Sequence, residues 1–507
     1  MGVQSCRHGM QVVAITLVVW TWVMACSIGV AGGQPAAQAL PSAVAARPWS
    51  AGEIETLSQQ LRAVIAKSPL DSAHVGAILL PVDPAGPLVA QFNAEKLFVP
   101  ASTLKLFTTA AALDTLGSEY RFTTSFSHTG MVKDGVLHGD LIVRSNGDPS
   151  FSATWCQDGD FCMGEIAGHL LSKGIHEVRG SLIADTSQFA GPLLGPAWEW
   201  DDLSYYYATP VDALSCGENT VEVSAVPGQP GAALAIRAVP EGYFSIKNQA
   251  IARAKGEDFC MARELGTETV TISGALAPRG KGVTAAVSVN DPARYFLFNM
   301  KNSMSKKGIR VSGGSQVIRE GLAAAAVPLF ERQSPPLQAV CAVVNRESHN
   351  LFAELTQHAV AHARTGKGDF ATGAALVRQW ATALGVDGDG MVIVDGSGLS
   401  RKNMISPKAM AEMLRAMVRR PVFPIYYASL PVAGSHGSMA RRLTGTKGEG
   451  VVHGKVGYMT GHSSIAGYAQ DQQGRWVVFA VMVNNNAGEP KEARMLQDEI
   501  VTLIVGR

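Results

Sequence analysis

The sequence has almost no net charge, and its charges of both signs are mixed along the chain. Its 507 residues carry 43 Lys and Arg against 42 Asp and Glu, so the formal charge is +1. Nucleic-acid binding depends on clustered positive charge, and this balance gives that function no electrostatic support. The chain also lacks a fixed-period repeat, which excludes solenoid and propeller architectures.

Motifs for metal or phosphate binding are missing as well. The histidines show no HExxH or comparable spacing, including the four nearest the C-terminal motifs, His349, His436, His453 and His462. A zinc peptidase is therefore not indicated. The glycine-punctuated stretch 445–454 has the composition of a loop and not that of a phosphate-binding cradle.

Cysteine is scarce, with seven in the chain, five of which follow the N-terminal segment. In an oxidising compartment these five can form disulfides. Cys156 and Cys162 make the best short-loop pair, and Cys216 with Cys260 is a second candidate pair. Cys341 lies in an apolar stretch, so we expect it to be a small buried core residue.

The N-terminal segment is typical of a secretion signal. A short basic stretch precedes an apolar run over 12–30, and Ala- and Pro-rich residues follow. We expect a signal peptide over 1–39, cleaved after Ala39. Two alternatives stay open: an uncleaved membrane anchor, because the run approaches the length of a spanning helix, and lipid attachment at Cys26. All three place the rest of the chain outside the cytoplasm, and we expect a periplasmic location.

The rest of the chain changes character twice. Strand patterns separated by Gly, Pro and Asp turns dominate 121–317, where helical signals are few. We therefore predict an α/β catalytic domain, 40–120 and 318–507, interrupted by a large β-rich insertion. Its helices are expected at 51–67, 100–113, 336–362, 370–384, 406–418 and 488–504, and its strands within 74–99 and near 449–459, 463–470 and 475–484.

Ser102 and Lys105 open an apolar, helix-like run over 100–113. Residues three apart share one face of a helix, close enough to exchange a proton. A serine hydroxyl becomes a good nucleophile when a base takes its proton, and a lysine moved partly out of water can be that base. Ser-x-x-Lys is the first motif of penicillin-binding proteins and class A β-lactamases.

Two further motifs follow in the order that the same enzymes use. Ser348 and Asn350 form a Ser-x-Asn pattern, which supplies a second hydroxyl and a carboxamide. Lys455, Val456 and Gly457 read as a Lys-Thr-Gly strand with valine in the threonine position. Three short motifs in the right order are far less frequent by chance than one.

With these motifs the chain resembles the class C low-molecular-mass penicillin-binding proteins, the D-Ala-D-Ala carboxypeptidase/endopeptidases of peptidase family S13. The resemblance covers nearly all of the chain after the signal segment. Family members carry two β-rich domains nested between the first two motifs, which implies two nested domains in the insertion. Further segments similar to the family's signatures are 100–105, 146–149, 198–202, 334–337, 395–403 and 430–434.

The resemblance implies a serine DD-peptidase of peptidoglycan that needs no metal or organic cofactor. Stem peptides would be its substrates, and β-lactams would inhibit it by leaving a slow acyl-enzyme. Ser102 would attack the carbonyl of a D-Ala-D-Xaa bond while Lys105 takes its proton. Ser348 and Asn350 would relay protons and hold the substrate amide, and Lys455 would lend positive potential near Ser348 and the substrate carboxylate.

The resemblance also assigns the residues that bind the oxyanion and the substrate. Backbone N–H groups of Ser102 and Tyr458 would hold the oxyanion. The substrate would be bound by Val456, Gly457 and Thr460, and its diaminopimelate amino group by Asp202 and Arg401.

One departure from the family concerns the substrate's terminal carboxylate. The family usually has hydroxyl residues at the positions of Val456 and Tyr458, and these hydroxyls bind that carboxylate. Losing one hydrogen bond to a charged group costs about 1.5–3 kcal/mol, or roughly ten- to a hundredfold in rate or affinity. Cross-link cleavage, weak carboxypeptidase activity or a changed substrate therefore fits better than a fast carboxypeptidase.

Other interpretations stay open from the sequence. A β-lactamase or esterase on the same core is one, although the large insertion argues against it. A non-catalytic cell-wall scaffold is another, supported by Val456 alone. For single residues, Ser348 is also a candidate helix N-cap, Asp202 a candidate surface aspartate, and Glu354 is expected to support its own helix instead of reacting.

Overall fold

The computed structural model describes residues 47–506, apart from 158, 255, 257, 279 and 322–325. The expected signal peptide and the lipid-attachment alternative at Cys26 therefore lie outside the described residues. Among the described helices, none is both long enough and apolar enough to cross a membrane.

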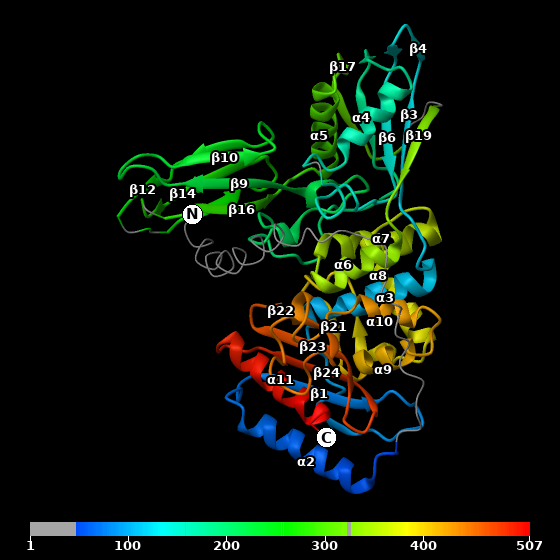
Figure 1. Cartoon of the computed structure of the whole chain (residues 1–507), viewed down its shortest axis with the longest axis vertical. Helices are drawn as coiled ribbons and strands as arrows, with labels where there is room; N and C mark the ends of the chain where they lie inside the picture. Colours follow the sequence, from blue (N-terminus) through cyan, green and yellow to red (C-terminus); the bar gives the residue numbers. More distant parts are fainter. Residues whose placement is uncertain are drawn as a thin grey trace. The chain divides into compact units, whose positions relative to one another are not determined.

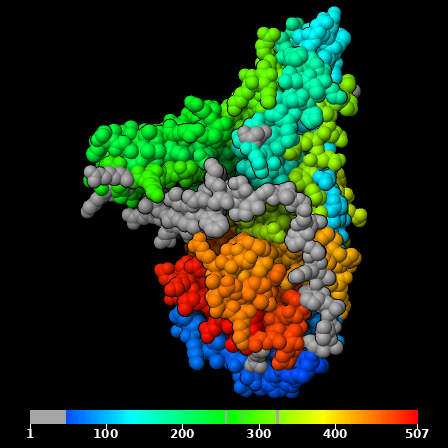
Figure 2. Space-filling model, in the orientation of Figure 1, coloured from blue at the N-terminus to red at the C-terminus, as the bar shows by residue number. Residues whose placement is uncertain are grey.

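The chain forms two compact units, each built from segments that are distant in sequence. Unit 1 contains Thr124–Ser187 and Trp198–Arg332. Unit 2 contains, among the described residues, 47–123, Gln188–Ala197 and 333–506. In Figure 2 the blue N-terminal residues of unit 2 lie against its red C-terminal residues, so both ends of the chain build one body.

A five-stranded antiparallel sheet forms the centre of unit 2. The first strand of the chain pairs with the last one along its whole length, from His74 opposite Asn484 to Pro81 opposite Val477. This pairing joins the two ends of the sequence in a single core. The spatial order is β2 (Ala90–Phe92), β1 (His74–Pro81), β24 (Trp476–Asn484), β23 (His462–Gln470) and β22 (His453–Met459).

Helices cover both faces of this sheet (Figure 1). On one face, α2 (Ala51–Lys67) and α11 (Pro490–Val505) pack in an apolar cluster with every second residue of β24, among them Phe479 and Val481. On the other face lies α9 (Pro407–Met417). Full burial of each large apolar side chain stabilises the sheet by about 1.5–3 kcal/mol.

The helix that begins at Lys105 is buried along most of its length. In α3 (Lys105–Leu116) every residue from Lys105 to Leu113 is buried. Several other helices enclose it, so side chains on all of its faces are buried. Its neighbours are α6 (Leu337–Arg346), α7 (Asn350–Thr365), α8 (Phe370–Ala383) and the short α10 (Phe423–Ser429).

The expected continuous helix over 336–362 is wrong at one point, because the structure divides it into α6 and α7. Ser348 lies between them with φ +60, a left-handed backbone through which an α-helix does not continue. The break leaves the Ser348 side chain at a helix junction instead of on a helix face.

Unit 1 is rich in strands, as expected for the insertion, but it also contains two helices that the sequence interpretation missed. They are α4 (Met163–Ser172) and α5 (Pro292–Lys306), and both contribute to its apolar core. The sequence signal for the start of α5 was present, because Asp291 caps this helix and Pro292 occupies its first turn. The largest sheet consists of β18 (Ser315–Ile318), β8 (Leu182–Asp185), β6 (Leu141–Ser145), β3 (Thr123–His128) and β19 (Val327–Gln333).

Smaller sheets complete unit 1. One has the order β10 (Ala235–Val239), β9 (Thr220–Val226) and β16 (Val283–Ser288). A second has the order β11 (Ser245–Asn248), β14 (Thr269–Ser273) and β13 (Cys260–Arg263). A third contains β17 (Arg310–Val311), β7 (Glu177–Val178), β5 (Val136–His138) and β4 (Met131–Lys133). A fourth consists of β12 (Ile251–Ala252) and β15 (Ala275–Leu276).

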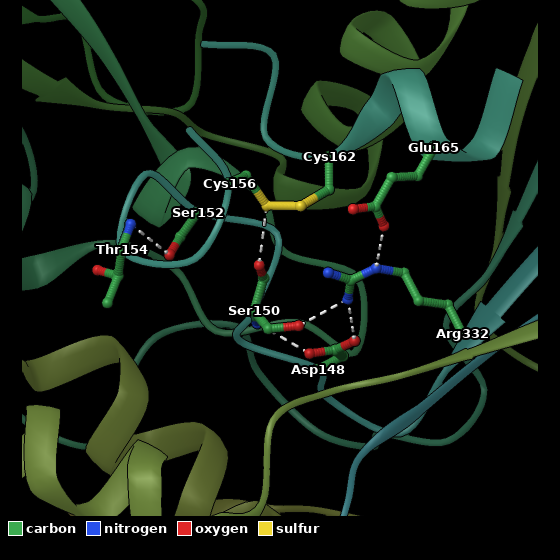
Figure 3. Close-up of a disulfide and its surroundings, with 8 residues drawn as sticks. All are labelled: Asp148, Ser150, Ser152, Thr154, Cys156, Cys162, Glu165 and Arg332. Atoms are coloured by element: carbon green, nitrogen blue, oxygen red, sulfur yellow. Dashed lines mark hydrogen bonds and ion pairs between the residues drawn. A yellow bond between two sulfur atoms is a disulfide. The ribbon is translucent and has the colours of Figure 1, made fainter. Parts of the chain in front are cut away.

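A disulfide joins Cys156 to Cys162 in unit 1 (Figure 3), as predicted. The second candidate pair, Cys216 with Cys260, is wrong, because Cys216 is a free thiol buried in the apolar core. Cys341 is likewise free and buried, as the apolar stretch around it indicated.

Beside the disulfide, Arg332 ties the returning chain to the start of the insertion (Figure 3). It donates to Asp148 at 3.1 Å, to Ser150 at 2.6 Å and to Glu165 at 3.2 Å. Its guanidinium also lies 4.4 Å from the centre of the Phe151 ring. Burial raises the pKa of Asp148, and the Arg332 charge opposes that shift. The signature segment 146–149 therefore has a structural role inside unit 1.

Removing the disulfide is expected to destabilise unit 1. The bridge closes a short loop, with a sequence separation of 6, and chain-entropy arguments for so short a loop give about 2 kcal/mol. We expect the double variant Cys156→Ala/Cys162→Ala to unfold at lower denaturant concentration, followed by circular dichroism. An unchanged unfolding transition would show that the bridge does not stabilise the unit.

Candidate active site

The turn that carries Ser102 is held in a strained conformation. Ser102 lies in the 3-10 turn η1 (Ala101–Leu104), directly before α3. Ala101 has φ +47, in the left-handed region that residues with a Cβ rarely adopt. Gly398 approaches so closely that a side chain there would overlap the Ala101 carbonyl group. Packing against a neighbouring loop thus fixes the position of the serine, and such strain is found at functional sites.

Lys105 is fully buried and makes three hydrogen bonds. Its Nζ donates to Ser102 Oγ at 2.9 Å, to Asn350 Oδ1 at 2.7 Å and to the Ser397 carbonyl oxygen at 2.6 Å. Burial lowers the pKa of Lys105 to about 7, although two nearby carboxylates oppose the shift. A large fraction of Lys105 is therefore uncharged at neutral pH.

The hydrogen-bond partners of Lys105 determine where its lone pair points. The amide oxygen of Asn350 and the carbonyl oxygen of Ser397 can only accept hydrogen bonds. A neutral amine has two N–H donors, and these two oxygens use both of them. The lone pair is then left for the Ser102 hydroxyl, which is the arrangement that a base needs to take the serine proton.

Glu354 is a site residue that the sequence interpretation misjudged. The expectation that it supports its own helix is wrong: its side chain is buried and accepts the backbone N–H groups of Gly396 at 2.7 Å and Ser397 at 2.8 Å. Burial and the adjacent Asp395 carboxylate raise the pKa of Glu354 to about 8. The available signal was a lone charged residue in an apolar run, one helical turn after Asn350.

Asp395 organises the other half of the same loop. Its Oδ1 accepts the N–H of Gly398 at 2.9 Å and the Asn403 side-chain amide at 2.8 Å, and its Oδ2 accepts the N–H of Ser400 at 2.7 Å. The sequence shows 395–403 as a segment similar to a family signature, but it does not reveal the contact of this loop with Lys105 through the Ser397 carbonyl.

Ser348 and Lys455 form the second hydroxyl–amine pair of the site. Lys455 is fully buried, and its Nζ donates to Ser348 Oγ at 2.9 Å and to the Val456 carbonyl oxygen at 2.6 Å. Burial and the neighbouring positive charge of Lys105 lower the pKa of Lys455 well below its usual value. The alternative of Ser348 as a helix N-cap is wrong, because His349 caps α7 by accepting the N–H of Phe352.

The edge strand β22 passes directly beside the nucleophile turn. A Cβ on Gly457 would lie 2.8 Å from Ser102 N and 2.7 Å from Pro100 O, so only glycine fits there. Gly454 donates its N–H to Pro431 O, away from β23. Since backbone direction alternates along a strand, the N–H of Tyr458 also points away from β23, at the free edge. The N–H of Ser102 therefore lies close to Gly457, the residue directly before Tyr458.

The remaining residues expected to bind substrate have distinct surroundings. Val456 is half-buried and packs against the apolar cluster of the sheet, while the Tyr458 side chain is 54% exposed. Arg401 donates to the Thr460 carbonyl oxygen at 3.2 Å, which places both at the end of β22. Asp202 belongs to unit 1, where its carboxylate accepts the Tyr207 hydroxyl at 2.7 Å.

Within the described part of the chain, no cluster of three or more His, Cys, Asp and Glu side chains is arranged to hold a metal ion. The polar groups that converge on Ser102 are amines, amides and hydroxyls. A helix-borne serine with a buried lysine three residues on, flanked by a Ser-x-Asn pair and an edge-strand lysine, defines a serine acyl-transfer enzyme of the penicillin-binding class.

Comparisons with known proteins identify the family within this class. The model of the D-Ala-D-Ala carboxypeptidase 3 (S13) family matches residues 57–504, so the chain belongs to that family. A D-alanyl-D-alanine carboxypeptidase of Actinomadura sp. (strain R39) is 30% identical over 457 residues, covering 87% of this chain and 83% of the relative. The carboxypeptidase DacB of Haemophilus influenzae is 25% identical over 425 residues, covering 82% and 86%.

The fold agrees with this assignment. Penicillin-binding protein 4 (dacB) of Haemophilus influenzae superimposes with a TM-score of 0.79 at 23% identity, covering 87% of this chain and 97% of that one. A structure of the same protein with a bound β-lactam gives a TM-score of 0.73 at 21% identity, covering 87% and 98%. The expected fold class, an α/β penicillin-binding domain interrupted by a β-rich insertion, is confirmed. The chain is a serine DD-peptidase.

Proposed function

We propose that this enzyme hydrolyses D-Ala–D-Xaa bonds of peptidoglycan stem peptides through an acyl-enzyme on Ser102. Lys105 takes the proton of Ser102 Oγ as the oxygen attacks the peptide carbonyl carbon. The C–N bond then breaks, and the leaving amine receives a proton through Ser348. Water hydrolyses the resulting ester and regenerates the Ser102 hydroxyl. The hydrogen bond of 2.9 Å between Lys105 Nζ and Ser102 Oγ is the observation that carries this proposal.

Charge that develops on the carbonyl oxygen is stabilised by backbone donors in this mechanism. The N–H groups of Ser102 and Tyr458 form the oxyanion hole, supported by the position of Gly457 close to Ser102 N. Asn350 holds the substrate amide, and Lys455 supplies positive potential near the substrate carboxylate. No step requires a metal ion or an organic cofactor.

We further propose that cleavage of cross-links is favoured over release of terminal D-alanine. The family description and the named relatives support carboxypeptidase chemistry. However, position 456 is a valine packed partly into the apolar cluster, so it offers no hydroxyl to a terminal carboxylate. The groups needed for acylation are therefore present, whereas the loss of a hydroxyl at position 456 weakens recognition of a free C-terminal D-alanine.

Defined muropeptides test this function. We expect the purified enzyme to convert a cross-linked dimer to monomers faster than it releases D-alanine from a pentapeptide monomer, as followed by liquid chromatography and mass spectrometry. The Ser102→Ala variant is the control and should leave both substrates intact. Equal hydrolysis by this variant would contradict the proposed nucleophile. Rapid turnover of penicillin without peptide hydrolysis would favour a β-lactamase or esterase instead.

We also propose the cellular setting and the domain division. A signal peptide over 1–39 directs the chain to the periplasm, where it acts on the wall, as its peptidoglycan-acting relatives support. The catalytic domain comprises 40–120 and 318–507, with the inserted domains over 121–317. Asp202 and Arg401 recognise the diaminopimelate amino group of the stem peptide.

Acylation is expected to depend on pH through Lys105. Below its pKa, which burial lowers to about 7, the amine is protonated and has no lone pair for the Ser102 proton. The second-order rate constant for acylation by a fluorescent penicillin should therefore rise with pH through about pH 7 and then level off. A profile that rises only near the usual lysine pKa would contradict the role of Lys105.

A further inference from the structure

The two buried carboxylates near Lys105 are fully occupied by a single loop. Glu354 and Asp395 are both completely buried, and a carboxylate is costly in such a place unless its oxygens accept hydrogen bonds. Their partners are largely backbone N–H groups of residues 396–400. Two buried acidic side chains thus fix a stretch of five residues.

This loop presents one carbonyl group to the amine of Lys105. The peptide group between Ser397 and Gly398 donates its N–H to Asp395 at 2.9 Å and accepts Lys105 Nζ at its carbonyl oxygen at 2.6 Å. Hydrogen bonds at the two ends of one peptide group polarise each other. Asp395 therefore strengthens the carbonyl acceptor that Lys105 uses. The carboxylate acts here through the peptide group between Ser397 and Gly398 and not by touching the amine.

Glu354 fixes the same loop from the side of α7. It accepts the two N–H groups that precede the Ser397 carbonyl, those of Gly396 and Ser397. A Cβ on Gly396 would lie 2.9 Å from both Ala353 O and Gln357 Cβ, so the loop is pressed against the helix. The loop is also tied to α3, since the hydroxyl of Thr108 donates to Gly396 O at 2.7 Å. The position of the Ser397 carbonyl relative to Lys105 is thereby determined by both helices.

We propose that Glu354 and Asp395 are positioning residues for acylation, because together they hold the loop whose Ser397 carbonyl accepts Lys105 Nζ. The inference rests on the proposed role of Lys105 as the base. A base in this enzyme must both take the serine proton and pass it on.

Other titratable groups also face Lys105. Lys455 on β22 is a second amine, and burial with the positive charge of Lys105 lowers its pKa well below the usual value. Burial and the charge of Lys105 lower the pKa of His349, at the start of α7, to about 3, so its ring is neutral. Asp395 raises the pKa of Lys105, and Glu354 does so in its ionised form.

The test is the pH profile of acylation by a fluorescent penicillin in the full-length Glu354→Gln variant. Glutamine keeps the shape of the side chain, but its amide nitrogen cannot accept an N–H. Burial keeps Glu354 largely protonated below its pKa of about 8, so we expect the rising limb near pH 7 to stay in place in this variant. We also expect the plateau rate to fall about tenfold, because the Ser397 carbonyl is no longer held in place.

Asp395→Asn is the second variant. It should lower the plateau rate in the same way, which keeps the test decisive where one variant fails to fold. It should also move the limb to lower pH, on the order of one pH unit, because it removes a negative charge near Lys105. The matched control is Asp114→Asn. Asp114 is on the same helix as Lys105, its side chain is 6% exposed, and it accepts Arg420 Nε at 2.9 Å and Trp380 Nε1 at 2.8 Å. It lies nine residues further along the helix, about 13 Å away. Its loss should affect stability without moving the limb.

The outcomes separate this inference from the proposed function. A plateau rate that falls in Glu354→Gln and Asp395→Asn but not in Asp114→Asn, with a limb that moves to lower pH only in Asp395→Asn, supports the inference. An unchanged plateau rate in both Glu354→Gln and Asp395→Asn overturns it and leaves the role of Lys105 intact. A wild-type profile with no limb in this range contradicts Lys105 as the base, and with it the proposed function itself.

Discussion

Replacement of Lys105 by methionine is expected to slow acylation by about a thousandfold, within the range that a positioned general base contributes. Methionine has a similar length but no group that can take the Ser102 proton. It also leaves Asn350 Oδ1 and the Ser397 carbonyl oxygen without the donor they share, at a cost of about 1–3 kcal/mol each in a buried site. The acylation rate with a fluorescent penicillin measures the effect, and circular dichroism verifies that the variant is folded.

Lys408 provides the matched control for this substitution. It is a partly exposed lysine at the start of α9 in the same unit, paired with Glu95 at 3.0 Å. Lys408→Met removes the same functional group far from Ser102 in sequence and should leave the acylation rate unchanged. Equal rates for Lys105→Met and the wild type would show that another group activates the serine.

Replacement of Gly457 by alanine is expected to reduce acylation by about a hundred- to a thousandfold, as the loss of one oxyanion donor does. A Cβ at this position would lie 2.8 Å from Ser102 N and 2.7 Å from Pro100 O. Both neighbours are backbone atoms, so the strand or the nucleophile turn must shift. Either movement displaces one of the two N–H groups that we assign to the oxyanion, on Ser102 and Tyr458. Pre-steady-state acylation by a β-lactam measures the effect.

Gly52→Ala serves as the control for the added methyl group. Gly52 lies in the first turn of α2 in the same unit, and a Cβ there would meet nothing within 4 Å. The control should keep the wild-type acylation rate. If Gly457→Ala also kept it, the close approach of β22 to the nucleophile turn would have no role in catalysis.

The architecture of unit 2 was predictable because its signals are local. The strands expected near 449–459, 463–470 and 475–484 correspond to β22, β23 and β24, and the helices expected at 51–67, 370–384, 406–418 and 488–504 correspond to α2, α8, α9 and α11. The order of the three motifs also required that both ends of the chain fold together. The pairing of β1 with β24 provides this connection.

Features that depend on contacts distant in sequence were not predictable. Glu354 lies 42 and 43 residues from the loop amides that it accepts, so no local pattern could reveal that role. The break at Ser348 has a similar origin, since its left-handed backbone is found beside the Lys455 amine, 107 residues away. Burial inside an apolar core also left Cys216 a free thiol, which spacing between cysteines cannot indicate.

The site shows how buried polar groups can be predicted in part. The residues that we propose to react, Ser102 and Lys105, form a short motif because they must share one face of a helix. Residues that hold the reacting groups, such as Asp395, act through backbone atoms and impose weaker constraints on sequence. The motifs therefore indicated the reaction, whereas the structure was needed to identify what positions Lys105.

The most direct test of the proposed mechanism is the intact mass of the purified protein after incubation with benzylpenicillin, beside the Ser102→Ala variant. The proposed acyl-enzyme predicts a lasting increase by the mass of one penicillin in the wild type and none in the variant. An adduct of equal amount in both proteins, or a wild type that stays unmodified towards penicillin and leaves cross-linked muropeptides uncut, would contradict catalysis by Ser102.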